Sequence, residues 1–153
     1  MSVEVGQEAP DFTLRDENGA EVALSSLRGR NVVLIFYPLA FSAICTKELH
    51  QTTELADRYG AAGAEVFGIS VDSPFALKAF KRDEGLSAHL LSDFHPKGAV
   101  AEMYDAYIPE AGVATRATYV IDKDGKVAHK AINNPGKVRD QESILEALAA
   151  CPV

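Results

Sequence analysis

The chain has 153 residues, of which 47% are hydrophobic and 24% are charged, and its formal net charge is -7 at pH 7. A chain of this length predicts one domain over residues 1–153, with a core large enough to fold without disulfides or a structural metal. The acidic balance disfavours nucleic acid and anionic membrane surfaces as partners.

The N-terminal sequence MSVEVGQEAPDF has neither the basic region nor the apolar region of a signal peptide, and no run of 18 apolar residues occurs. We therefore expect a cytoplasmic protein that does not span a membrane. The chain has two cysteines, Cys45 and Cys151. In a reducing cytoplasm a disulfide framework is not expected, so any cysteine chemistry would be catalytic or redox-linked.

Strands and helices alternate in the first half of the chain. Residues 12–14 and 21–24 predict a short N-terminal hairpin. A continuous apolar run at residues 31–37 is typical of a strand buried on both faces. A helix predicted over residues 42–59 and a second buried strand over residues 64–71 complete a βαβ unit with parallel strands.

The second half of the chain continues this alternation. The predicted order is helix, strand, helix, strand, strand and helix, over residues 73–84, 89–91, 97–104, 117–121, 126–132 and 138–150. The Asp-Lys-Asp-Gly turn at residues 122–125 joins two of the strands as a hairpin. This order predicts an α/β protein with a thioredoxin-like fold, in which a central mixed β-sheet is flanked by helices and extended by the N-terminal hairpin.

Cys45 lies in the first turn of the predicted helix over residues 42–59. Unpaired amide groups and the positive end of the helix dipole gather there, and such a position favours the nucleophilic thiolate. The hydroxyl of Ser42, three residues earlier, can cap the helix or contact a substrate oxygen beside the sulfur. These patterns alone leave a second interpretation open, in which Cys45 is a small buried apolar residue and Ser42 is only a cap.

Several segments together resemble the peroxiredoxin family. The matching positions are Pro38, Ser42 and Cys45 of the motif P-x-x-x-[TS]-x-x-C, the opening APDFTL, the acidic Glu48, the segment at residues 64–72, the Leu-Ser-Asp segment at residues 91–93, and Arg116. The resemblance covers essentially the whole chain. It implies a thiol-dependent peroxidase that reduces hydrogen peroxide and organic hydroperoxides and needs no cofactor.

The resemblance also implies roles for individual residues. The Cys45 thiolate attacks a peroxide oxygen and becomes a sulfenic acid, which a thiol then reduces. Ser42, Arg116 and the amides at the helix start are placed to stabilise the charge on the leaving oxygen. Pro38, which lacks an N–H group and has a fixed φ, shapes the loop and shields the sulfur from water.

Three charged residues have alternative interpretations. In the family, the residue that matches Glu48 orients arginines near the cysteine. Arg116 matches one of these arginines, and Arg139 is a candidate for a second one that supports the catalytic residues without being one of them. Without the resemblance, Arg116 is typical of a surface arginine paired with a carboxylate. Arg139 would serve only the first turn of the last helix, and Glu48 would be a solvated helix residue.

The source of the reducing thiol depends on the second cysteine. His50 stands where one class of peroxiredoxins has its resolving cysteine, and Glu48 excludes a C-x-x-C pair. Cys151 directly follows the last predicted helix, so it is either incidental or a resolving cysteine on a short C-terminal arm.

Among peroxiredoxins, the phrases PLAFSAIC, LLSDFHPKGAV and NNPGKVRDQ resemble the one-cysteine AhpE-type proteins of actinobacteria. This resemblance implies a homodimer and an external reductant, either a thioredoxin- or mycoredoxin-like protein or a low-molecular-weight thiol. Two features depart from the pattern. Ser42 replaces the usual threonine, and Cys151 is not expected in a strict one-cysteine member.

Three functions are compatible with these sequence patterns. They are a peroxidase, a peroxide sensor that signals through the same sulfenic acid, and an interaction domain with an inert cysteine. The combination of Pro38, Ser42, Cys45 and Arg116 favours the first over the third. Only catalytic turnover separates a peroxidase from a sensor. The four histidines lack metal-ligand spacing, and no phosphate loop or dinucleotide motif occurs, so neither a metal nor a bound cofactor is predicted.

Overall fold

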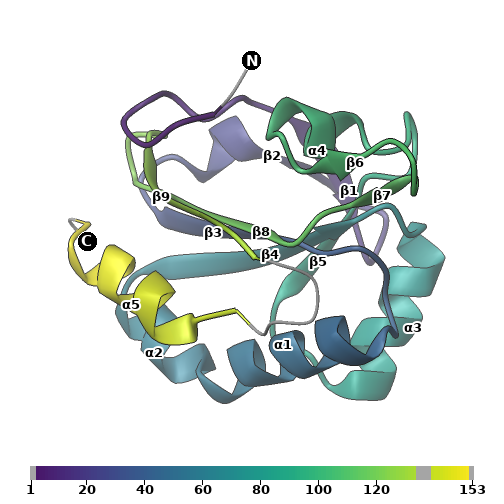
Figure 1. Ribbon diagram of the computed structural model, residues 1–153. Coiled ribbons are helices and arrows are strands. Elements are labelled where there is room, and N and C mark those ends of the chain that lie inside the picture. The colour runs from purple at the N-terminus through teal and green to yellow at the C-terminus, as the bar shows by residue number, and fades with distance from the viewer. Residues whose placement is uncertain (1–2, 134–138, 152–153) are drawn as a thin grey trace.

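A seven-stranded mixed sheet forms the centre of the computed structural model, which describes residues 3–133 and 139–151 (Figure 1). Its strands are β1 (Thr13–Asp16), β2 (Glu21–Ala23), β3 (Asn31–Phe36), β4 (Ala64–Ser70), β5 (His89–Ser92), β8 (Ala117–Ile121) and β9 (Val127–Ile132). Their order in the sheet is β2-β1-β5-β4-β3-β8-β9. Strands β3, β4 and β5 run parallel, whereas β8 is antiparallel to β3 and β9 is antiparallel to β8.

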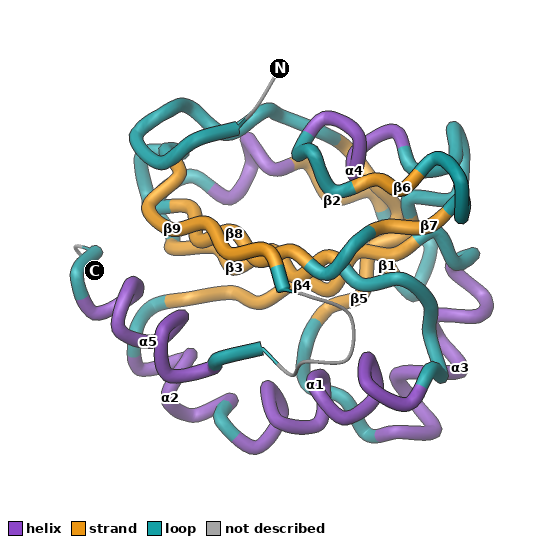
Figure 2. The backbone as a smooth tube through the Cα atoms, viewed as in Figure 1, coloured by secondary structure: helices purple, strands orange, loops and turns teal. Residues whose placement is uncertain are grey.

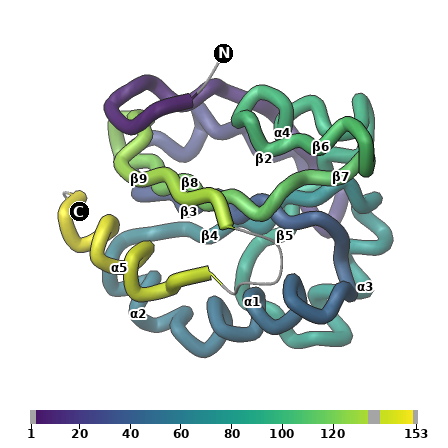
Figure 3. Tube along the Cα trace, viewed as in Figure 1, coloured from purple at the N-terminus to yellow at the C-terminus, as the bar shows by residue number. Residues whose placement is uncertain are grey.

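Helices cover one face of this sheet, and shorter elements cover the other (Figure 2). The remaining elements are α1 (Ala43–Glu54), α2 (Ala56–Ala61), α3 (Pro74–Glu84), α4 (Ala99–Met103), α5 (Gln141–Ala149), the 3-10 helix η1 (Leu24–Leu27) and a ribbon of β6 (Tyr107–Ile108) and β7 (Val113–Ala114). Helices α1, α2, α3 and α5 lie on one side, and the N-terminal segment and α4 lie on the opposite side (Figure 3).

Strand β3 is buried over its whole length because both faces of the sheet are covered. Val32, Leu34 and Phe36 belong to the apolar cluster on the α4 side, whereas Val33 and Ile35 belong to the cluster beneath α5. The continuous apolar run of the sequence therefore follows from burial on two faces. This strand carries the chain directly to the loop before Cys45.

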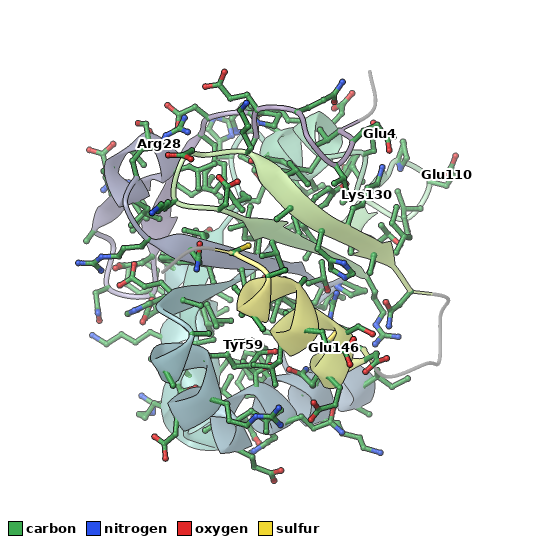
Figure 4. All side chains as sticks on the ribbon, turned by 90° about the vertical axis from the view of Figure 1, so that its left-hand side faces the viewer. Glu4, Arg28, Tyr59, Glu110, Lys130 and Glu146 are labelled. Carbon is green, nitrogen blue, oxygen red and sulfur yellow. The ribbon has the colours of Figure 1, made fainter. Side chains whose placement is uncertain are left out.

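Helix α5 is joined to the helical face by polar contacts as well as apolar packing. The Tyr59 hydroxyl donates a hydrogen bond to Gln141 Oε1 at 2.5 Å, and Arg58 pairs with Glu142 on the surface. Figure 4 shows Tyr59 on this side of the sheet, and Lys130 and Glu4 together on the other side. The start of α5 is thus fixed against α2.

The predicted α/β class and thioredoxin-like arrangement are confirmed, including the βαβ unit of β3, α1 and β4 and the β1–β2 hairpin. The single helix predicted over residues 42–59 is wrong, because the chain breaks at Leu55 between α1 and α2. Thr52 and Thr53 donate their hydroxyls to the carbonyls of Glu48 and Leu49. Such bonds to the preceding turn bend helices, which accounts for the break.

Two predicted helix starts were also too early. Helix α4 begins only after Gly98, whose left-handed φ of 74° lies outside the helical region. Helix α5 begins at Gln141 because Asp140 caps it, accepting a hydrogen bond from the Ser143 amide. Position 138, the predicted start, lies outside the described residues. The β6–β7 ribbon was not predicted. In the described ranges, no helix is long and apolar enough to cross a membrane.

Gly68 in β4 makes room for the side chains beneath α1. A Cβ atom at this position would lie 3.0 Å from both the Tyr37 ring and the Leu90 side chain, and 3.7 Å from Leu49. Tyr37, Leu49 and Leu90 are all fully buried, so none of them can move into solvent. A glycine is therefore required where the strand approaches this cluster.

We expect Gly68→Ala to lower the free energy of unfolding by about 1–3 kcal/mol, because the added methyl overpacks the cluster. Urea denaturation measures this change. Gly60→Ala is the matched control, since nothing lies within 4 Å of the added Cβ in α2. There the substitution should be neutral or stabilise by about 0.5–1 kcal/mol, as alanine does in a helix. An unchanged stability for Gly68→Ala would contradict this account of the packing.

Candidate active site

Cys45 lies in the first turn of α1, as the sequence predicted. The helix begins at Ala43, and its first hydrogen bond runs from the Thr46 amide to the Ser42 carbonyl at 2.9 Å. The amides of Ala43, Ile44 and Cys45 therefore have no acceptor within the helix. They add positive potential at the position of the sulfur.

The side chain of Cys45 is only 3% exposed and packs in an apolar cluster between α1, α3 and the sheet. The other buried members are Tyr37, Leu49, Leu77, Phe80, Leu86, Ala88 and Leu90. Burial raises the pKa of Tyr37 far above its ordinary value, so this phenol stays neutral beside the sulfur. The cluster keeps water away from the thiol.

One turn after Cys45, the carboxylate of Glu48 is buried between two arginines. Glu48 is 1% exposed. Its Oε2 atom forms an ion pair with Arg116 Nη2 and lies 3.4 Å from Arg139 Nε. The same oxygen accepts a hydrogen bond from the Arg139 amide at 2.7 Å. One carboxylate thus joins α1, the residue before β8 and the segment before α5.

The guanidinium of Arg139 also donates hydrogen bonds to two groups of the central sheet. Its Nη1 donates to Thr118 Oγ1 at 3.0 Å, and its Nη2 donates to the Phe36 carbonyl at the end of β3. Burial lowers the pKa of Arg139 to about 10, whereas the charges of Glu48 and Cys45 act in the opposite direction. Arg139 therefore remains protonated at neutral pH and interacts electrostatically with Cys45.

The ionised groups behind Cys45 carry a surplus of positive charge. Arg116 and Arg139 contribute two positive charges, and Glu48 contributes one negative charge. In a buried environment this surplus is weakly screened. It attracts an anion on the neighbouring sulfur, or an oxygen that becomes negative during a reaction.

The loop before α1 positions the more exposed predicted residues. Ser42 occupies the N-cap position, but its Oγ donates to the Leu39 carbonyl at 2.8 Å and does not cap the helix amides. Of the two roles that the sequence allowed for this hydroxyl, the structure does not show the helix-capping hydrogen bond. Pro38 is half-buried at the start of the loop. Phe41 adopts a left-handed φ of 67° and packs its ring against Phe80, with 4.9 Å between the ring centres.

The structure places the predicted charged residues together in one buried cluster. Glu48 and Arg116 are buried and paired, so they are neither solvated nor surface residues. Arg139 precedes the Asp140 cap of α5 and therefore lies outside the first turn of that helix. Thr118, which holds Arg139, was missed. Its only signal was a hydroxyl within the apolar strand ATYVI.

Cys151 lies apart from this site. It belongs to the cluster beneath α5 with Val33 and Val120, and its Sγ donates to the Ala147 carbonyl at 3.3 Å. Burial, reinforced by Asp122, raises the pKa of Cys151. Its thiol therefore stays protonated at neutral pH, which is the unreactive form. Both cysteines are free thiols.

No histidine lies in the described part of this site. His50 pairs with Glu84 at 2.8 Å and joins α1 to α3 near the surface. Across residues 3–133 and 139–151, no group of three or more histidine, cysteine or acidic side chains is arranged to hold a metal ion.

Comparisons with known proteins agree on one family. The AhpC/TSA family model matches residues 5–130. Alkyl hydroperoxide reductase E of Mycobacterium tuberculosis is 42% identical over 147 residues, which cover 95% of this chain and 96% of that protein. A chloroplast 2-cysteine peroxiredoxin of Chattonella marina is 35% identical, covering 98% of this chain and 81% of its own length.

Solved structures give the same result. Peroxidoxin BcpB of Mycobacterium tuberculosis superposes with a TM-score of 0.87 at 30% identity, covering 99% of both chains. The reduced 2-Cys peroxiredoxin of Plasmodium vivax has a TM-score of 0.86 at 30% identity, covering 95% of this chain and 80% of that chain. The matched family region contains Cys45, Glu48 and Arg116 but ends before Arg139.

We expect Glu48→Gln to destabilise the fold by about 3–5 kcal/mol, because two buried guanidiniums would lose their shared carboxylate. Chemical denaturation measures the loss. Glu142→Gln is the matched control, since it breaks the exposed Arg58–Glu142 pair at 2.7 Å, and we expect little change there. Equal stabilities for the two variants would contradict the importance of the buried ion cluster.

Proposed function

The chain belongs to the AhpC/TSA family of peroxiredoxins, and we propose that this thiol-dependent peroxidase reduces hydroperoxides through a sulfenic acid on Cys45. The position of Cys45 carries the proposal. This cysteine combines the start of a helix, an apolar enclosure and a neighbouring surplus of positive charge. The helix start and the positive charge favour the anionic form of the sulfur, and the apolar enclosure leaves both weakly screened by water.

The reaction has two stages. The Cys45 thiolate attacks one oxygen of the hydroperoxide, the O–O bond breaks, and the other oxygen leaves as an alcohol or as water after taking up a proton. Cys45 is thereby oxidised to the sulfenic acid. A thiol then attacks this sulfur, releasing water and forming a mixed disulfide. A second thiol breaks that disulfide and returns Cys45 to its starting state.

The surrounding residues act on the first stage. We assign Arg116 and the amides at the start of α1 to the charge that develops on the leaving oxygen. The Ser42 hydroxyl donates to Leu39 but keeps lone pairs that can accept the O–H of a hydroperoxide. Pro38 shapes the loop above the sulfur. Glu48 and Arg139 hold the positive charge in position, and we treat both as positioning residues.

We propose that the reductant is external to the chain, as in a one-cysteine peroxiredoxin. The support is the placement of Cys151, which lies in a different apolar cluster from Cys45 and donates its hydrogen bond to the backbone of α5. A thioredoxin- or mycoredoxin-like protein or a low-molecular-weight thiol supplies the electrons. A reducing cytoplasm, where free thiols persist, is the matching location.

We expect Cys45→Ser to abolish peroxide consumption in a steady-state assay with hydrogen peroxide or an organic hydroperoxide and an excess of small-molecule thiol. Serine lacks the sulfur that the reaction oxidises. Cys151→Ala is the matched control and should retain the wild-type turnover, because its thiol takes no part. Consumption of only one equivalent of peroxide by the wild type would instead indicate a sensor. Loss of turnover in Cys151→Ala would indicate a resolving cysteine.

We also propose that the chain forms a homodimer through the loops that follow β3, β4 and β5. Hydrogen bonds join these loops, from Ala40 to Asp72 and from Ser92 to Asp72. Leu39, Phe41 and Phe94 lie on these loops, Phe75 lies in the first turn of α3, and all four are large apolar side chains exposed to solvent. A patch of this kind is typical of a protein interface, and it places the second copy beside the active-site loop.

We expect Phe75→Glu to shift the protein from dimer to monomer in light scattering coupled to size exclusion. Phe75 is 87% exposed in the first turn of α3, where an acidic residue is compatible with the helix. Val5→Glu is the matched control, because Val5 is also exposed but belongs to the N-terminal segment, which lies on the opposite side of the sheet from α3 (Figure 3). A wild-type monomer, or equal masses for both variants, would contradict this interface.

A further inference from the structure

The loop between β3 and α1 is tied to the end of β4 by one long-range hydrogen bond. The Ala40 amide donates to Asp72 Oδ2 at 2.8 Å, which joins residues 32 positions apart. Ser42 and Thr46, in contrast, make local bonds to the carbonyls of Leu39 and Ser42. The bond to Asp72 therefore links the position of the loop to the sheet.

Asp72 is itself held by hydroxyls from the ends of two strands. Its Oδ2 accepts a second hydrogen bond from Ser70 Oγ at 2.7 Å, and its carbonyl accepts one from Ser92 Oγ at 2.6 Å. Ser70 is fully buried at the end of β4, and Ser92 is buried at the end of β5. The carboxylate that receives the Ala40 amide thus cannot turn away freely.

The loop needs such an anchor because it contains a strained residue. Phe41 follows Ala40 and adopts a left-handed φ of 67°. A bulky residue in this region costs about 1–3 kcal/mol and persists only where its surroundings enforce it. The Phe41 ring rests on Phe80, and the amide just before it is fixed by Asp72. Two contacts therefore enforce the turn that delivers Ser42 to the start of α1.

We infer that Asp72 is a positioning residue for the peroxidase reaction. Through the Ala40 amide it holds the loop that leads through Ser42 to the start of α1, where Cys45 lies. The inference rests on the proposed function and adds to it a residue outside the P-x-x-x-[TS]-x-x-C motif. The hydrogen bonds of the Asp72 carboxylate go to the Ala40 amide and the Ser70 hydroxyl. Its effect reaches the reaction through the backbone of residues 38–42.

The test compares a substitution of Asp72 that removes the hydrogen-bond acceptor with one that keeps it. Asp72→Ala removes the acceptor, and we expect kcat/KM for hydrogen peroxide to fall about 10- to 100-fold, as misplaced reacting groups typically cause. Asp72→Asn keeps a carbonyl oxygen that can accept both bonds, and it should stay within about threefold of the wild type.

Alkylation by iodoacetamide separates positioning from a general loss of stability. When the loop is released in Asp72→Ala, the buried Cys45 becomes more accessible, so its alkylation should accelerate while peroxide reduction slows. The control is Asp122→Ala, which removes a carboxylate that accepts the amides of Asp124 and Lys126 at the far end of the sheet. We expect lower stability in this variant, with both Cys45 rates unchanged.

Several outcomes would overturn the inference while leaving the proposed function intact. One is a wild-type rate for Asp72→Ala, and another is an equal loss in Asp72→Asn and Asp72→Ala, which would assign the effect to charge. A third is parallel slowing of peroxide reduction and alkylation. Failure of the wild-type protein to turn over peroxide would instead overturn the proposed function itself.

Discussion

The buried carboxylate of Glu48 is the constraint on which the site depends. It binds Arg116 before β8 and Arg139 before α5, and it lies one turn beyond Cys45 on α1. Three segments that are distant in sequence therefore meet at one oxygen atom. Ions buried to this degree are expensive, and an apolar replacement often folds at least as well. Their presence here is best explained by the positive charge that they hold beside the sulfur.

The surroundings of the ion cluster make this charge effective. The apolar cluster of Tyr37, Leu77 and Phe80 excludes water from Cys45, so charges act on the sulfur through a poorly screening medium. The helix amides add to the same potential. The loop of residues 38–42 leads into the helical turn that carries Cys45, and Asp72 ties this loop to the sheet. The buried charges and the anchored loop thus both border the helical turn that carries Cys45.

Local features of this arrangement could be predicted from the sequence, whereas long-range ones could not. The apolar run of β3 and the placement of Cys45 in a first helical turn follow from patterns within a few residues. The break at Leu55 was missed because it depends on threonine hydroxyls that compete with helix geometry. Sequence patterns do not decide the role of Arg139, since its partners Glu48 and Thr118 lie 91 and 21 positions away. No spacing rule connects residues so far apart, and only the family resemblance suggested the link.

The central claim is that Cys45 is the residue that reacts with peroxide. The most direct measurement treats the reduced protein with one equivalent of hydroperoxide in the presence of dimedone, which traps sulfenic acids, and identifies the modified peptide by mass spectrometry. The account predicts the dimedone adduct on Cys45, with Cys151 recovered as a thiol. Consumption of the peroxide while Cys45 remains an unmodified thiol would contradict it.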